Sequence, residues 1–319
     1  MGHQLRRRRL GAHGPEVSEV GVGTNNFGRR LDKEGAAAVV NAALDLGVNL
    51  FDTADIYGGG DSERFLGAAL RGRRDHAVIA TKFGMPMEGL EPSDRRGSRE
   101  YIRRAIVGSL SRLGVEHVDL YQMHEPDPNT PIAETLGALH ELVEEGKVRW
   151  LGVSNFAAWQ IVDAQWTARS QRLTEITSSQ DEYSLLNREI EGEVLPAVEH
   201  LGLGLLPYFP LASGLLTGKY RRGQPPPSGT RLAGPAPANW LADQGRFDKV
   251  EALEAFASAH GLSLLQVAIG SLLGRRAVSS VIAGAMSPEQ VRANVEATSF
   301  IASDDDWRDL DAITKGSHQ

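Results

Sequence analysis

The sequence predicts an α/β fold, a (β/α)8 TIM barrel with an N-terminal hairpin and a long loop after the seventh strand. Short β-rich runs alternate with longer helical patterns along the chain, as expected for repeated βα units and a parallel sheet. Eight such runs are present, and no change in composition divides the 319 residues. We therefore expect residues 1–319 to form one domain, since single-domain barrels often reach this length.

The same alternation places the individual elements. Strands are expected near residues 18–24, 48–51, 77–82, 117–123, 148–153, 174–179, 203–207 and 278–282. Helices are expected at Lys33–Leu46, Ser62–Arg71, Arg99–Leu113, Ile132–Glu145, Ala157–Ala168, Arg188–His200, Asp248–Leu273 and Ser287–Thr298. Gly261 should break the segment Asp248–Leu273 into two helices.

Two serines and four glycines mark helix ends. Ser62 and Ser98 are each followed by an acid within two residues, so their hydroxyl groups are expected to cap helix N-termini. A glycine follows four of the helical patterns, where a left-handed residue commonly ends a helix. These glycines are Gly47, Gly114, Gly146 and Gly202.

The segment Arg221–Arg246 interrupts the alternation. It contains Pro225, Pro226 and Pro227 in succession, with further Pro and Gly residues after them, so regular structure is not expected. It follows the seventh strand, on the face where barrel enzymes build their active sites. Long loops in compact domains are often functional. The segment is therefore expected to be either a cover over a binding site or a plain surface excursion.

Composition limits the possible functions. Hydrophobic residues make up 41% and charged residues 24% of the chain, as in ordinary globular proteins. No run approaches the ~18 consecutive apolar residues of a membrane helix. The N-terminus lacks the apolar stretch of a secretory signal. The chain has no cysteine, which excludes disulfides, thiolate catalysis and cysteine-ligated metals. These features are typical of a cytoplasmic protein.

Charge bears on the choice of partner. The formal net charge of −7 argues against a nucleic-acid partner, because phosphate binding requires a basic face. The basic run Arg6–Arg9 is either a nucleic-acid or targeting patch, or a solvated strand of an N-terminal hairpin. The hairpin is favoured because the chain supplies no second basic patch.

Four titratable residues lie at the ends of three consecutive expected strands. Asp52 follows the second strand, and Tyr57 lies on the loop after it. Lys82 ends the third strand and His124 the fourth. Charged groups at the carboxyl ends of barrel strands are typically catalytic, and strands ~4.8 Å apart would bring Asp52 and Lys82 together. Each residue alone is more often a turn former or a solvated side chain, but the set indicates an active site.

The chemistry of this set indicates reduction of a carbonyl group. A phenol with a pKa near ~10 is a weak acid at neutral pH, and an ammonium group within ~4–6 Å lowers that pKa. Asp52 would keep Lys82 charged and in place. Tyr57 would then donate a proton while neutral His124 donates a hydrogen bond to the carbonyl oxygen during hydride addition.

Several motifs resemble those of the aldo-keto reductases and follow that family's order along most of the chain. They are Phe51–Gly58 with Ser62-Glu63 and Leu66-Gly67 after it, Asp119–His124, Gly152–Phe156 and Pro210–Lys219. The resemblance implies a NAD(P)H-dependent (β/α)8 carbonyl reductase whose catalytic residues are Asp52, Tyr57, Lys82 and His124. The run Pro210–Lys219 and the long loop are most similar to the bacterial and potassium-channel-β-subunit-like branch.

The same resemblance implies a set of cofactor contacts. Ser154, Asn155 and Gln180 match positions that hold the nicotinamide amide, and Tyr208 matches the aromatic residue that stacks on the nicotinamide ring. Placement at strand ends favours this role over simple helix capping or packing. Further contacts are expected from Leu211, Gly214, Gly284, Ser287, Gln290 and Asn294.

The turn Ile282–Gln290 matches the family's site for adenine and the 2′-phosphate, with Ser287 at a helix N-terminus that would attract an anion. Family members that bind NADPH tightly often have Lys or Arg here, whereas this chain has Ala285, Met286 and Gln290. NADPH is the expected cofactor and NADH an open alternative. The chain also lacks a full Gly-x-Gly-x-x-Gly fingerprint after its first strand, which agrees with cofactor binding at a barrel rim.

Loop residues Phe27, Phe83 and Trp240 are expected to form apolar walls of the substrate pocket, which favours a bulky or uncharged carbonyl compound. No metal is expected, because no His-x-His or carboxylate pair ends a strand. The leading function is a carbonyl reductase with a small-molecule substrate and no nucleic-acid or membrane partner.

The alternative is a cofactor-binding regulatory subunit with slow turnover, similar to potassium-channel β subunits. The short segment before the first expected strand disfavours it. The oligomeric state stays open.

Overall fold

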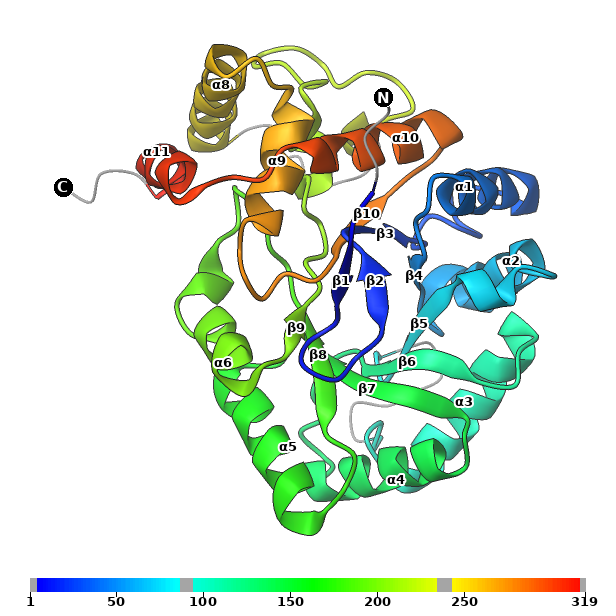
Figure 1. Cartoon of the computed structure of the whole chain (residues 1–319). Helices are drawn as coiled ribbons and strands as arrows, with labels where there is room; N and C mark the ends of the chain where they lie inside the picture. Colours follow the sequence, from blue (N-terminus) through cyan, green and yellow to red (C-terminus); the bar gives the residue numbers. More distant parts are fainter. Residues whose placement is uncertain (1–4, 87–93, 234–242, 316–319) are drawn as a thin grey trace.

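Eight parallel strands form one sheet that curls into a barrel, as the computed structural model of residues 5–86, 94–233 and 243–315 shows (Figure 1). The predicted fold class is confirmed. Around the barrel the strands are β10 (Val281–Gly284), β3 (Val20–Gly23), β4 (Leu50–Asp52), β5 (Val78–Phe83), β6 (Val118–Met123), β7 (Val148–Ser154), β8 (Ile176–Gln180) and β9 (Gly204–Leu205). The barrel closes where the Leu205 amide donates to the Ala277 carbonyl at 2.7 Å and Ser279 donates to the Leu205 carbonyl at 3.0 Å.

Helices surround the barrel, and those before β10 lie on the connections between successive strands (Figure 1). They are α1 (Lys33–Asp45), α2 (Asp61–Ala69), α3 (Arg99–Leu113), α4 (Ile132–Glu144), α5 (Ala158–Gln171), α6 (Val194–Leu201), α8 (Gln244–Ala259), α9 (Leu264–Leu273), α10 (Pro288–Glu296) and α11 (Asp304–Thr314). The expected break at Gly261 separates α8 from α9. The helix expected at Arg188–His200 is divided into a 3₁₀ turn at Glu189–Glu191 and α6. The sequence analysis missed α11.

Helix ends follow local chemistry, with one exception. The Ser98 side chain accepts a hydrogen bond from the Tyr101 amide and caps α3, as expected. The glycines at positions 47, 114, 146 and 202 all adopt positive φ, also as expected. The prediction for Ser62 was wrong, because α2 begins one residue earlier, at Asp61. The buried Ser62 hydroxyl instead lies 2.7 Å from that of Thr24 and 2.9 Å from that of Thr53, where it joins β3 to β4.

The basic run belongs to the expected hairpin, formed by the antiparallel strands β1 (Arg7–Arg9) and β2 (Glu16–Ser18). The hairpin crosses one end of the barrel (Figure 1). Leu10 and Val17 pack there with interior residues of the barrel. The run is more than a solvated strand, because Arg6 and Arg8 donate to the two carboxylate oxygens of buried Glu19 at 2.9 and 2.8 Å. The hairpin therefore plugs the amino end of the barrel.

Within the described ranges, no single helix is long and apolar enough to cross a membrane. The helices α8 and α9, bent by 91° at their junction, meet the length and hydropathy requirement only as a pair.

Two helical glycines give opposite expectations for substitution by alanine. A Cβ on Gly67 of α2 would lie 1.9 Å from the Leu113 carbonyl oxygen, whereas a Cβ on Gly137 of α4 has no neighbour within 4 Å. Gly67→Ala should lower the free energy of unfolding by about 1–3 kcal/mol through overpacking. Gly137→Ala should raise it by up to about 1 kcal/mol through helix propensity. Denaturant unfolding measures both changes, and similar effects of the two would contradict the close α2–α3 packing.

Candidate active site

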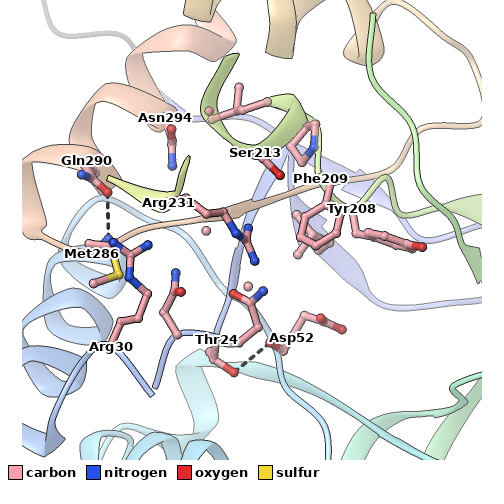
Figure 2. Close-up of a pocket in the computed structure, with 18 of the residues that line it drawn as sticks. Thr24, Arg30, Asp52, Tyr208, Phe209, Ser213, Arg231, Met286, Gln290 and Asn294 are labelled. Atoms are coloured by element: carbon pink, nitrogen blue, oxygen red, sulfur yellow. Dashed lines mark hydrogen bonds between the residues drawn. The ribbon is translucent and has the colours of Figure 1, made fainter. Parts of the chain in front are cut away.

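The carboxyl ends of the strands surround a cavity of about 810 Å³ (Figure 2). The hairpin covers the opposite end of the barrel. Five residues that line it are the last residues of their strands: Gly23, Asp52, Ser154, Gln180 and Gly284. Parallel strands bring their carboxyl ends to one rim, which is where barrel enzymes place their reactive groups.

An ion pair is buried below this cavity. Lys82, which is fully buried, donates from Nζ to Asp52 Oδ2 at 2.6 Å and to the Thr53 carbonyl at 2.9 Å. The other carboxylate oxygen of Asp52 accepts a hydrogen bond from Gln180 Nε2 at 2.8 Å. Burial is the largest single effect on Lys82 and opposes its charged form, but the charges and hydrogen bonds of Asp52 and Tyr57 together outweigh it and raise the Lys82 pKa. The predicted contact between Asp52 and Lys82 is thus present.

Tyr57 and His124 lie beside this ion pair. The Lys82 ammonium is 5.1 Å from the centroid of the Tyr57 ring, and the Tyr57 and His124 rings meet edge to face at 5.8 Å. Gly58, with φ of 59°, lets the chain turn sharply after Tyr57, and a Cβ there would lie 2.7 Å from the Phe27 carbonyl oxygen. The structure therefore brings together all four residues that the sequence singled out.

The two rings have different protonation behaviour. Burial, and then the charge of Lys82, lowers the pKa of His124 to about 3, so its imidazole is neutral at physiological pH. Burial raises the pKa of Tyr57 above its ordinary value, and the charge of Lys82 acts in the opposite direction. The sequence analysis expected the charge of Lys82 to lower the Tyr57 pKa, and this is correct for the interaction between these two residues. It is wrong for the net shift, because desolvation is the larger effect.

Asp55, two residues before Tyr57, is a buried carboxyl group to which the sequence analysis gave no role. Its side chain is 8% exposed, and Oδ1 has no hydrogen-bond partner within the described residues. Burial, and next the charge of Glu63, raises the Asp55 pKa to about 7. The loop that positions Tyr57 therefore contains a carboxyl group that titrates near neutral pH.

The expected nicotinamide-binding residues form a network on the cavity wall. The Ser154 hydroxyl donates to the Gln180 carbonyl at 2.8 Å. Asn155 Nδ2 donates to the His124 carbonyl at 2.9 Å, and its Oδ1 accepts from the Tyr208 hydroxyl at 2.8 Å. Asn155 adopts a positive φ of 60°, and it lies outside α5, which starts at Ala158. Neither Ser154 nor Asn155 caps that helix, so their side chains face the cavity network instead.

The remaining expected cofactor contacts also lie around the cavity, with one exception. The residues that line it are Leu211, Gly214, Gly284, Gln290 and Asn294. Ser287 does not line it. The Ser287 hydroxyl accepts a hydrogen bond from the Gln290 amide and caps α10.

The expected apolar walls need correction. Phe27 and Phe83 are fully buried in the main core and do not line the cavity. Lys82 uses the inward-facing position near the end of β5, so the next side chain, Phe83, points to the other side of the sheet. There its ring packs 4.7 Å from that of Tyr121. Trp240 lies outside the described residues.

Sequence reasoning missed the cationic residues of the cavity wall, which are Arg29, Arg30, Lys219 and Arg231. Arg29 and Arg30 lie on the loop between β3 and α1, and Arg231 starts a 3₁₀ turn after the Pro-rich run. The signal available in the sequence was the doublet Arg29-Arg30 on the loop after the first barrel strand.

Comparison with known proteins identifies the family. The family model described as "Aldo/keto reductase family" matches residues 19–315. The chain belongs to the aldo/keto reductase family. Its members are oxidoreductases of carbonyl compounds that generally use nicotinamide cofactors.

Three relatives match this chain along nearly all of its length. An uncharacterized oxidoreductase, YrpG, from Bacillus subtilis is 38% identical over 96% of this chain and 95% of its own. A probable voltage-gated potassium channel subunit beta from Oryza sativa subsp. japonica is 37% identical over 93% and 92%. A probable aldo-keto reductase 1 from Glycine max is 33% identical over 96% and 88%.

The raised pKa of Asp55 predicts a pH-dependent gain of stability in Asp55→Asn. Between about pH 4 and pH 7 the unfolded chain ionises this carboxyl group while the folded chain keeps it protonated, so wild-type stability falls as pH rises. Asp55→Asn should therefore raise the free energy of unfolding by on the order of 1–3 kcal/mol above about pH 7, and have little effect below about pH 4. Denaturant titrations across this range measure the difference. Asp309→Asn, at an exposed carboxyl group on α11, is the control, and a pH-independent effect of Asp55→Asn would contradict the assignment.

Proposed function

We propose that this chain reduces aldehydes or ketones to alcohols, with NADPH as hydride donor and Tyr57 as proton donor. The observation that supports this most strongly is the buried Lys82–Asp52 pair beside the facing rings of Tyr57 and His124. A carbonyl oxygen bound at these rings would accept hydrogen bonds from both, which stabilises the negative charge that develops during reduction.

The residues around the cavity fit a dinucleotide. Its volume of about 810 Å³ lies in the range of cofactor sites. The network of Ser154, Asn155 and Gln180 offers donors and acceptors for a carboxamide, and Tyr208 offers an aromatic face at the same wall. When bound, the cofactor would supply a hydride to the substrate carbon.

The protein's own groups would manage the proton. Lys82, held by Asp52, stabilises the phenolate that Tyr57 becomes after it donates its proton. Neutral His124 can donate a hydrogen bond only from a protonated nitrogen. Its Nδ1 atom is buried without a partner among the described residues. An N–H group there would be an unsatisfied donor, so we assign the proton to Nε2.

Replacement of Tyr57 tests the proton donor. Tyr57→Phe removes the hydroxyl group and keeps the ring that contacts His124. Turnover of a carbonyl substrate should fall by roughly 10²–10⁴-fold, while the Kd for NADPH stays within about twofold. Steady-state kinetics and fluorescence titration measure these quantities. Full activity of this variant would remove Tyr57 from the mechanism.

Replacement of Lys82 tests the assistance to Tyr57. Lys82→Met removes the charge that lowers the Tyr57 pKa, so the basic limb of the pH–rate profile should move to higher pH and turnover should fall by at least roughly tenfold. The single variant leaves the Asp52 carboxylate buried and unpaired, which would cost about 3–5 kcal/mol of stability. The double variant Asp52→Asn/Lys82→Met avoids this cost and should show a smaller shift in the same direction, because the charge of Asp52 itself raises the Tyr57 pKa. An unchanged pH profile in both would contradict the pairing.

A second candidate function is a cofactor-binding subunit of a larger assembly, which the similarity to the rice channel subunit supports. Titration of the purified protein with NADPH and NADH, followed by a panel of aldehydes and ketones, separates the two. Fast oxidation of bound cofactor by some carbonyl compound supports the reductase. Tight binding without oxidation supports the regulatory subunit.

A further inference from the structure

The described wall of the cavity has an excess of positive charge. Arg29, Arg30, Lys219 and Arg231 line it, and Asp52 is the one carboxylate in the described lining. That carboxylate is already bound to Lys82. Since the whole chain has a net charge of −7, this local reversal of sign indicates an anionic ligand.

Three of these cations form a cluster without carboxylate partners. Arg29, Arg30 and Arg231 form no ion pair with any described residue. Arg30 donates from Nη2 to the Gly229 carbonyl at 2.6 Å, and Arg231 lies 4.8 Å from the Phe209 ring centroid. Burial, followed by the charges of Arg30 and Arg29, lowers the pKa of Arg231. The three like charges therefore destabilise one another unless an anion lies between them.

The cluster has a defined place along the cavity. Arg30, Met286 and Gln290 all line the cavity, and in the view of Figure 2 they appear at the end away from Asp52 and Tyr208. With the nicotinamide at the Asp52 and Tyr208 end, as proposed above, the adenosine half of the dinucleotide would reach Arg30. Arg231 lies between these two ends, near Phe209.

The turn before α10, where the sequence indicated phosphate binding, is already satisfied by its own residues. The Met286 amide donates to Gln290 Oε1 at 2.8 Å, and the Gln290 amide donates to the Ser287 hydroxyl. Glu289 adds a negative charge in the first turn of α10. These groups leave little attraction for a phosphate, so a phosphate at this end needs a cation from another loop.

We propose that Arg30 binds the 2′-phosphate of NADPH and makes this chain select NADPH over NADH. The inference rests on the proposed function. A guanidinium group matches the geometry of a phosphate oxygen pair, and charge-assisted hydrogen bonds of this kind are strong. NADH has an uncharged hydroxyl group at the same position. Arg231, in the middle of the cavity, is assigned to the pyrophosphate that both dinucleotides share.

Charge-removing substitutions separate these roles. In fluorescence titrations of the full chain, Arg30→Met should weaken NADPH binding by about 10- to 100-fold and change NADH binding by less than about twofold. Arg231→Met should weaken both dinucleotides alike. Arg292→Met, at an exposed arginine on α10 outside the cavity lining, should change neither. Arg30→Lys keeps the charge and should retain part of the preference.

Competition with adenosine 2′-monophosphate provides a second measurement. This compound should displace bound NADPH from wild-type protein and compete far more weakly in Arg30→Met. Equal weakening of NADPH and NADH in Arg30→Met would overturn the inference and assign Arg30 to the pyrophosphate or to loop closure. Equal affinities for NADPH and NADH in the wild type would also overturn it. If the wild type binds neither dinucleotide, the proposed function fails as well, before any substitution is made.

Discussion

The buried ion pair between Lys82 and Asp52 determines the geometry of the whole rim. Each ion alone would be very costly to bury, so both must keep their partners. Lys82 contacts Asp52 and the Thr53 carbonyl, and Asp52 also accepts from Gln180. These bonds connect the carboxyl ends of β4, β5 and β8 across the barrel. The rings of Tyr57 and His124 are placed relative to this fixed pair.

One cavity contains two electrostatic environments. Beside Tyr57 and His124, burial keeps the imidazole neutral and the phenol protonated, which suits groups that donate hydrogen to a developing negative charge. Toward Arg30 the wall holds cations without carboxylate partners in the described structure, which suits a ligand that arrives with its charge already formed. The environment of Tyr57 and His124 suits proton transfer to a reacting group, and the environment of Arg30 suits binding of an anionic ligand.

Sequence patterns predicted the features that depend on residues close together in the sequence. They missed the features that depend on contacts between residues far apart in the sequence. The ends of successive strands gave Asp52 and Lys82, because parallel strands share one rim. Phe83 was misplaced because side chains alternate across a strand, and Lys82 takes the inward position. The cluster of Arg30 with Arg231 could not be predicted, since two loops about 200 residues apart meet only after the barrel closes. The four residues expected at the strand ends are together in space.

Closure of the barrel has a consequence for synthesis of the protein. β3 lies between β4 and β10 in the sheet, and β10 leaves the ribosome after every other strand in the described residues. Contacts this distant in sequence form late and slow the folding of barrels. Gly284, at the end of β10, is also part of the cavity wall. A nascent chain therefore exposes one edge of β3 until β10 has been synthesised, and a chain that stops before β10 would have an open sheet and an incomplete cavity.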